Sequence, residues 1–328
     1  MWRRLAGMAI ALVLGAPIAW AQPLTWGPVV TRTARGCDAF TPVRAADGHH
    51  YTAFGDCGGL TGRLPKLSMG FGRIIGGPVN ARVQDLPTAT LRDYGNGPAG
   101  MKPSSAIIVG KRMYMWVRNY GPNGTQARLK YSDDYLKGAN STWRWSSVRL
   151  TRFGYPVFVQ GVTARYVYIV VHDDPSAYVP ADRFLLFRVP SDKLLDRGSY
   201  EFFSGTPASP AWSKIHADAR AIFAARDQCY RSGMSYNRAR NRYYWWQNKG
   251  RKFTNNSFEI WSAPKPWGPF TRLYRAGPDR WDVNPGERGE FPVAWMGPQP
   301  ISQPGTMHLL FSGHDQLMIR RVTIARGY

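Results

Sequence analysis

The strongest constraint in this sequence is a short pattern that occurs five times: a strand-like run, a turn, and an aromatic-rich strand-like run. The turns are rich in Gly, Asn or Asp, and such turns between apolar runs predict β-hairpins. The predicted hairpins cover residues 40–54, 106–117, 157–170, 233–246 and 292–311. Each is followed by a further strand-like run, at residues 67–75, 127–132, 184–189, 258–263 and 318–324. Only the stretch 213–225 hints at a helical period.

Repeated four-stranded units separated by turns are typical of a β-propeller. Aromatic stretches at 143–145, 200–203 and 270–274 supply fourth strands. We therefore predict an all-β fold, a five-bladed β-propeller in a single domain over residues 35–328. Residues 22–34 are an N-terminal extension that suits a strand closing the ring against the last blade. Because the hairpins are irregularly spaced, a β-sandwich with long loops is the alternative.

The first 21 residues have the layout of a secretory signal peptide. A short basic segment ends at Arg4, an apolar run reaches Ile18, and Ala19-Trp20-Ala21 has the small-x-small pattern of a cleavage site. We expect cleavage near Ala21 and a mature protein that is secreted or periplasmic. An uncleaved membrane anchor is the alternative, although the apolar run is short for a membrane-spanning helix.

The chain is strongly basic, with 43 Lys and Arg against 21 Asp and Glu and a formal net charge of +22. Net charge informs about partners and solubility, not about the fold. The densest basic clusters, at residues 238–242 and 249–252, predict a rim that attracts an anionic cell-envelope surface. A solvated basic surface spread over many loops is the alternative.

Two cysteines and two aspartates flank the first hairpin. In a regular antiparallel register, Cys37 lies opposite Cys57 and Asp38 lies opposite Asp56. Because side chains alternate between faces along a strand, the cysteines share one face and the aspartates the other. Opposed Cβ atoms lie about 4.5–5.5 Å apart, near disulfide range, so a Cys37–Cys57 disulfide is expected in an exported protein. Two independent buried thiols are the alternative, and Cys229 has no assigned partner.

Neighbouring carboxyl groups resist ionising together, and glycosidases use such a pair as acid and as base or nucleophile. We therefore predict Asp38 and Asp56 as catalytic residues. The structural alternative is that Asp38 caps a turn and Asp56 bonds the Gly58-Gly59 loop, because aspartate is common in turns.

Other polar residues are expected at the same end of the central channel, where inner strands start and their hairpin partners end. The predicted substrate-binding residues are Lys102, Asn119, His172, Asp173, Arg231, Glu290 and His314. Glu290 is the best further carboxylate for acid or pKa-tuning work. No cofactor or metal site is predicted, because the six histidines lack metal-ligand spacing. A structural calcium ion stays open as an alternative.

Several phrases resemble one family of secreted bacterial proteins. They are DGHHYTAFGD at 47–56, MKPS at 101–104, YSDD at 131–134, FLLFRVP at 184–190, YEFFSG at 200–205, APKPWGPF at 263–270 and FSG at 311–313. Their order resembles a former domain-of-unknown-function family now classed as glycoside hydrolase family 183, the endo-D-arabinanases. This resemblance implies a five-bladed propeller that hydrolyses D-arabinofuranosyl linkages with inversion, with Asp38 and Asp56 matching the family's catalytic aspartates.

The sequence thus predicts a secreted, inverting glycoside hydrolase that cleaves arabinofuranosyl, D-arabinan-like linkages in a bacterial envelope glycan. Its expected partner is a polysaccharide substrate, and we expect a monomer without a nucleic-acid partner. A noncatalytic glycan-binding propeller is the first alternative. A binder of anionic polymers, suggested by the charge, is the second, and its binding would weaken steeply with salt.

Overall fold

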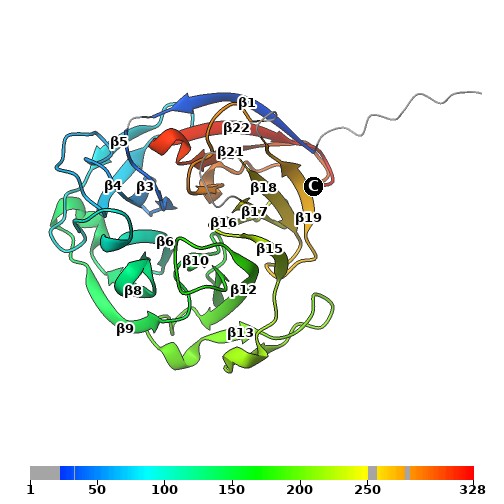
Figure 1. Ribbon diagram of the computed structural model, residues 1–328. Helices are drawn as coiled ribbons and strands as arrows, with labels where there is room; N and C mark the ends of the chain where they lie inside the picture. Colours follow the sequence, from blue (N-terminus) through cyan, green and yellow to red (C-terminus); the bar gives the residue numbers. More distant parts are fainter. Residues whose placement is uncertain (1–22, 33, 250–256, 278–280) are drawn as a thin grey trace, which may run out of the picture.

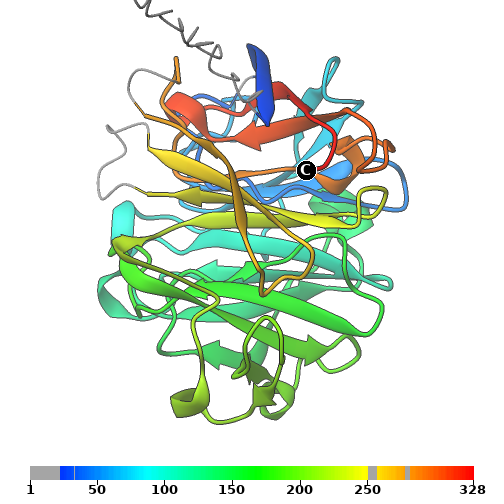
Figure 2. The same ribbon diagram turned by 90° about the vertical axis from the view of Figure 1, so that its right-hand side faces the viewer.

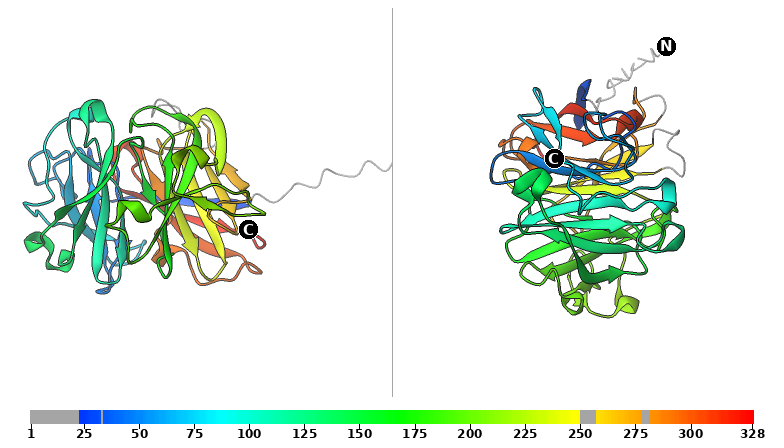
Figure 3. Two further views of the ribbon diagram at one scale, coloured as in Figure 1. Left: turned by 90° about the horizontal axis from the view of Figure 1, so that it is seen from below. Right: turned by 90° about the vertical axis from the view of Figure 1, so that its left-hand side faces the viewer.

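Five antiparallel sheets stand around a common axis, and the inner strand of each sheet faces the centre of the ring (Figure 1). The computed structural model describes residues 23–32, 34–249, 257–277 and 281–328. Figure 2 and Figure 3 show the same ring from its edges. The arrangement confirms the predicted all-β, five-bladed propeller.

Each sheet is one blade, numbered in chain order. Blade 1 contains β2 (Val43–Arg44), β3 (His50–Phe54), β4 (Gly70–Ile75) and β5 (Arg82–Asp85). Blade 2 contains β6 (Lys102–Val109), β7 (Arg112–Arg118), β8 (Ala127–Ser132) and β9 (Arg144–Leu150). Blade 4 contains β16 (Ser232–Asn237), β17 (Arg242–Asn248), β18 (Phe258–Ala263) and β19 (Thr271–Arg275).

The other two blades depart from the simple four-strand order. Blade 3 contains β10 (Val157–Phe158), β11 (Tyr166–His172), β12 (Ala181–Pro190), β13 (Glu201–Phe203) and β14 (Trp212–Ser213), and β15 (Phe223–Cys229) pairs with β12. Blade 5 contains β20 (Gly289–Glu290), β21 (Gly305–Phe311), β22 (Met318–Ile324) and β1 (Leu24–Thr31). Blade 5 is therefore built from both ends of the described chain.

The helical segments of the described residues are short 3-10 turns in loops. They are η1 (Gly97–Ala99), η2 (Pro122–Gly124), η3 (Tyr135–Asn140), η4 (Arg197–Ser199), η5 (His216–Asp218), η7 (Val293–Trp295) and η8 (Gly313–Asp315). Within the described ranges, none of these helices has the length and apolar character needed to cross a membrane. The predicted signal peptide, residues 1–21, lies outside the described residues.

The N-terminal strand closes the ring. β1 pairs antiparallel with β22, from Leu24 opposite Ile324 to Thr31 opposite Met318. In Figure 1 the two strands, blue and red, run side by side at the outside of blade 5. This is the place that the sequence indicates for the N-terminal extension.

Apolar side chains fill the spaces between neighbouring blades. The indole ring of Trp116 in blade 2 lies 6.0 Å from the ring of Phe158 in blade 3. Phe184 of blade 3 similarly lies 4.9 Å from Trp245 of blade 4. Because a sheet packed between two others is buried on both faces, its central strands are apolar along their whole length instead of alternating. This burial explains the aromatic second strand of each hairpin.

Two details of the predicted elements are wrong. The sequence places the inner strand of the last blade at 292–295, but this strand is β20, and Val293–Trp295 forms the turn η7 instead. Pro292 has no N–H to give to a strand ladder, and its carbonyl accepts a hydrogen bond from the Trp295 N–H at 2.8 Å. The stretch 213–225, which hints at a helix, contains the end of β14, η5 and the start of β15.

Candidate active site at the axial mouth

Charged side chains gather at one end of the ring axis. β6 begins at Lys102, and the ladder partner of Lys102 is Arg118, at the end of β7. Arg231 directly precedes β16, and Glu287 lies two residues before β20. Inner strands therefore start where their partners end. We use the name axial mouth for the set Asp38, Asp56, Lys102, Arg118, Arg231 and Glu287.

Asp38 and Asp56 are not directly opposed, which corrects the predicted register. Asp38 pairs with Gly55, and each backbone N–H donates to the other's carbonyl oxygen at 3.0 Å. Cys37 still lies opposite Cys57, with 4.7 Å between their Cα atoms. Asp56 is thus one extra residue, and its φ of 59° is in the left-handed region. Such a bulge changes the direction of a side chain and is often found at functional sites.

Asp56 nevertheless pairs with Lys102, and the charge of Asp38 also acts on this lysine. Asp56 Oδ1 forms an ion pair with Lys102 Nζ, and the Lys102 side chain is 1% exposed. Burial lowers the pKa of Lys102, with a smaller contribution from the Arg118 charge, while the hydrogen bond to Asp56 and the negative charges of Asp38 and Asp56 oppose this shift. Gly55 leaves room for the Asp38 carboxylate, because a Cβ at this position would collide with Asp38 Oδ1.

Two fully buried arginines connect blades 2 and 4 to a glutamate before blade 5. Arg118 Nη2 lies 3.3 Å from Glu287 Oε2 and 4.0 Å from Asp38 Oδ2. Arg231 Nη1 forms an ion pair with the same Glu287 oxygen. The guanidinium carbons of both arginines lie 5.4 Å from the centre of the Tyr155 ring. Since an unpaired buried charge is costly, these contacts hold the arginines in a defined arrangement.

A third aspartate lies near the predicted catalytic pair. Asp315 follows β21, and its N–H donates to the Ser312 carbonyl at 3.2 Å. Desolvation raises the pKa of Asp315, and the negative charges of Asp38 and Asp56 raise it further. The negative charges of Asp38 and Asp56 therefore reach Asp315.

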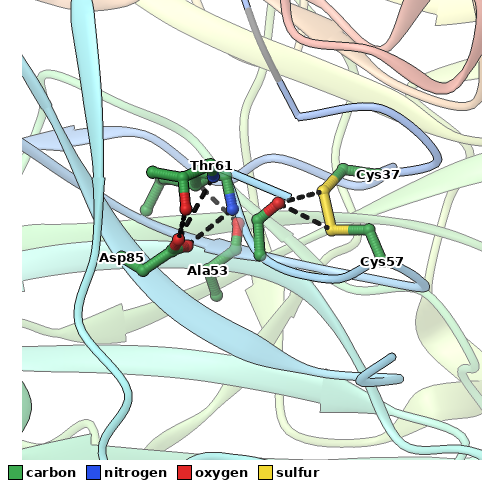
Figure 4. Close-up of a disulfide and its surroundings, with 8 residues drawn as sticks. Cys37, Ala53, Cys57, Thr61 and Asp85 are labelled. Carbon is green, nitrogen blue, oxygen red and sulfur yellow. Dashed lines mark hydrogen bonds between the residues drawn. A yellow bond between two sulfur atoms is a disulfide. The ribbon is translucent and has the colours of Figure 1, made fainter. Parts of the chain in front are cut away.

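The predicted disulfide between Cys37 and Cys57 is confirmed (Figure 4). The carbonyl oxygen of Gly59 lies 3.4 Å from Cys37 Sγ and 3.6 Å from Cys57 Sγ. Asp85, at the end of β5, accepts a hydrogen bond from the Thr61 N–H at 3.2 Å. The disulfide and Asp85 thus fix the loop that follows the bulge at two points.

Asn119 and His314 border the mouth but have structural contacts of their own. Asn119 Nδ2 donates to the Gly100 carbonyl and to the Tyr178 hydroxyl, both at 2.8 Å. His314 is exposed, and its Nε2 accepts a hydrogen bond from the Asn284 N–H at 3.3 Å. Their predicted roles in substrate binding stay predictions.

Three further predicted binding residues have contacts of their own, and their predicted roles in substrate binding stay predictions. His172 is fully buried, with Nε2 2.7 Å from the Ser176 carbonyl, and burial lowers its pKa to about 4. Glu290 is also buried, where desolvation raises its pKa, and it forms an ion pair with Arg288. Asp173 forms an ion pair at 2.6 Å with an arginine of β12.

Sequence reasoning missed Glu287, although this residue lies only two positions before the inner strand β20. Its segment is shaped by Gly286, whose φ is 69° and where a Cβ would collide with the backbone of Ser312. The Gly286 carbonyl also accepts a hydrogen bond from Asn248 Nδ2 at 3.0 Å. The Pro-Gly-Glu sequence at 285–287 was the available signal.

One arginine of the first predicted basic cluster, Arg240, does not belong to a solvated rim, whereas Arg238 in the same cluster is exposed. Arg240 is 1% exposed, and its guanidinium donates to the carbonyl oxygens of Gln303 at 3.0 Å, Ala325 at 3.0 Å and Tyr328 at 2.9 Å. It therefore ties the C-terminal segment to blade 4. Of the second cluster, residues 250–252 lie outside the described residues, and Lys249 is paired with a carboxylate at 3.1 Å.

Within the part of the chain that the structure describes, no group of three or more His, Cys, Asp or Glu side chains is arranged to hold a metal ion.

Comparisons with solved structures show what the fold is similar to. The α-L-arabinofuranosidase PaAbf62A from Podospora anserina, solved with cellotriose, has 10% sequence identity and a TM-score of 0.52, covering 94% of this chain and 99% of that chain. The catalytic domain of the Coprinopsis cinerea GH62 α-L-arabinofuranosidase has 11% identity and a TM-score of 0.51, covering 92% of this chain and 98% of that chain. At such identities the likeness concerns the fold alone. The sequence matches no family model and no curated protein.

Proposed function

We propose that this protein is a glycoside hydrolase that cleaves arabinofuranosyl, D-arabinan-like linkages in a bacterial envelope glycan with inversion. The observation that carries the proposal is that Asp38 and Asp56 lie together at the axial mouth, Asp56 paired with the buried Lys102 and Asp38 beside the buried Arg118. The family 183 resemblance and the fold likeness to arabinofuranosidases agree with this reading. The proposed enzyme acts as an exported monomer.

Asp56 is the better candidate for the base. Its side chain is 26% exposed, which leaves room for a water molecule, and its ion pair with Lys102 holds the carboxylate in place. The base takes a proton from the water that attacks the anomeric carbon, on the face opposite the leaving group. Inversion requires this water to fit between the two carboxyl groups, about 6.5–9.5 Å apart in such enzymes.

Asp38 is then the acid that gives its proton to the departing glycosidic oxygen. Its side chain is only 9% exposed and lies 4.0 Å from Arg118 Nη2, which helps to fix its position. Among the described residues, Asp38 Oδ1 has no hydrogen-bond partner, so this oxygen is left for a ligand. Arg118 and Lys102 fix the positions of the two aspartates without touching the reacting atoms.

The experiment offers the purified protein a panel of arabinans, galactans and related polysaccharides and follows the products by chromatography. Asp38→Asn and Asp56→Asn should each lower turnover roughly 10²- to 10⁴-fold. Asp133→Asn is the matched control, because this aspartate forms exposed ion pairs away from the mouth, with Arg112 and Arg144. The anomer released first, followed by NMR, reports inversion or retention.

A substrate with a nitrophenyl leaving group separates the two roles, because this group departs without an acid. Asp38→Asn should keep most of its activity on a nitrophenyl arabinofuranoside, whereas Asp56→Asn should lose it. Binding of an arabinan without any turnover would contradict the hydrolase and favour the noncatalytic glycan-binding propeller.

A further inference from the structure

A second cavity lies between the outer strands of blades 2 and 3. It measures about 270 Å³. Its lining combines the end of β9 and the following loop with η4, β13 and the segment before η5: Arg149, Leu150, Thr151, Arg152, Phe153, Arg197, Phe202, Lys214 and His216. Four of these side chains are cations, and none is a carboxylate.

The cations of this cavity lack acidic partners. Among the described residues, no ion pair involves Arg149, Arg152, Arg197 or Lys214. The nearby Asp196 is already engaged, since it accepts hydrogen bonds from the Gly198 N–H at 2.9 Å and the Ser199 hydroxyl at 2.6 Å. A concave site with several cations and no counter-charge attracts an anion from solution.

Two of the lining groups are partly buried, which makes the site more than an exposed patch. Arg197 is half-buried, burial lowers its pKa, and its guanidinium lies 5.5 Å from the Tyr200 ring. His216 Nε2 is buried without a hydrogen-bond partner among the described residues. The nearest acid to His216 is Asp173, at 3.8 Å, and Asp173 is held by Arg183 at 2.6 Å. An oxyanion in the cavity would partner both groups.

Part of the cavity lining lies at the same end of the propeller as the axial mouth. Ala127 pairs with Arg118 on one side and with Leu150 on the other, so β9 ends at the level of the mouth. Phe153, which lines the cavity, is two residues from Tyr155, whose ring contacts the buried arginines of the mouth. A polymer bound in the mouth can therefore extend outward to the cavity along one face.

We propose that this cavity, named here the β9–η4 pocket, binds a phosphoryl oxyanion carried by a glycan chain. The planar guanidinium of arginine can bind two phosphate oxygens at once, which a lysine ammonium group cannot do. Here three arginines surround a space sized for one substituent. Applied to the substrate, the inference rests on the proposed function: the glycan would carry phosphate groups beyond the cleaved linkage. A long single-sign surface, as nucleic acids or membranes require, is not what a pocket of this size provides.

The test measures binding, not turnover, so that it is independent of hydrolysis. Calorimetric titrations at fixed ionic strength use inorganic phosphate and a short poly(glycerol phosphate), with a neutral arabinan and polygalacturonate for comparison. Arg152→Glu combined with Lys214→Glu, two exposed positions, should weaken binding of both phosphate probes at least roughly tenfold. Asp38→Asn should bind the phosphate probes like the parent protein even if the proposed hydrolase activity fails.

The matched control is Lys111→Glu combined with Lys265→Glu, which makes the same change in net charge. Both lysines are exposed, and they lie at the opposite end of the propeller, after β6 and after β18. This control should keep phosphate binding, and thermal melting should show that both double variants are folded. Equal loss in the control, no binding of either phosphate probe, preference for polygalacturonate, or binding to anionic vesicles alone would each overturn the proposal.

Discussion

At the scale of single residues, Lys102 is the group on which the charges of the mouth depend. It is buried and ion-paired with Asp56, and it lies within reach of Asp38 and Arg118. Its position follows from the ladder that starts β6 opposite the end of β7. The proposed reaction requires Lys102 to be protonated, because a neutral amine would leave Asp56 without its cation.

The pH dependence of activity should therefore report on Lys102. Because burial lowers the pKa of Lys102, rising pH removes its proton earlier than that of an ordinary lysine. We expect kcat/KM to fall on the alkaline side, and Lys102→Arg to move this fall to higher pH, since arginine stays charged. The measurement is the pH profile of kcat/KM for both proteins.

Lys130 provides the control for this profile. It is a second buried lysine, away from the mouth, and burial lowers its pKa to about 8. The contrary result would be that Lys130→Arg moves the alkaline fall of kcat/KM and Lys102→Arg does not. The fall would then not report the Lys102–Asp56 pair, and the proposed role of Lys102 would be wrong.

At the scale of elements, the first hairpin combines a bulge with a covalent bond. The extra residue in the hairpin is Asp56 itself, held in a left-handed conformation. The Cys37–Cys57 disulfide closes the strand ends beside it. This arrangement turns a flexible strand end into a fixed position for one carboxylate.

Breaking the disulfide should therefore affect both stability and activity. The bond joins residues 20 apart, and a loop of this length is worth about 3 kcal/mol of unfolding free energy. Cys37→Ser combined with Cys57→Ser should lower the free energy of unfolding by that amount and reduce turnover further than the stability loss explains. Denaturant unfolding and steady-state kinetics on the folded protein measure the two effects.

Cys229 offers the comparison, because it is a buried free thiol in blade 3, and burial raises its pKa to about 11. Cys229→Ser should leave turnover unchanged and make the protein insensitive to thiol reagents without removing the disulfide. Unchanged turnover in the double serine variant would show that the disulfide does not position Asp56.

The hairpins could be predicted from the sequence because turn chemistry and aromatic strands are local signals. The bulge at Asp56 could not, because its register depends on how Asp38, Gly55 and the disulfide fit together in space. Glu287 could not be predicted as a site residue for a similar reason, because its partners Arg118 and Arg231 come from blades 2 and 4. Residue order does not reveal which strand ends meet across a ring.

The basic clusters also show that residue order does not reveal which groups meet in the folded protein. A run of arginines in the sequence suggests a solvated surface, but Arg240 is buried among carbonyl oxygens near the C-terminus. Its guanidinium satisfies acceptors that no neighbouring strand reaches. The cations of the β9–η4 pocket, in contrast, come from three separate segments of the chain. The sequence contains no local cluster that would predict this pocket.

At the scale of the whole molecule, the ring depends on pairing its two ends. β1 gives blade 5 its outermost strand, and Leu24, 3% exposed, packs among the side chains between blades 4 and 5. Arg240 adds a second tie by binding the carbonyl oxygens of Ala325 and Tyr328. Blade 5 therefore unites contributions from the first and last described segments.

Removing β1 should open this closure. A chain starting at residue 32 leaves the backbone groups of β22 unpaired along its outer side, and it loses the burial of Leu24, worth about 2–3 kcal/mol by itself. We expect the melting temperature to fall by roughly 5 °C or more and the protein to associate through the exposed edge. Thermal melting and light scattering measure these effects, and a chain starting at Pro23 is the control. The two chains differ in one described element, β1. Equal melting temperatures would therefore mean that the pairing of β1 with β22 contributes nothing to the stability of the protein.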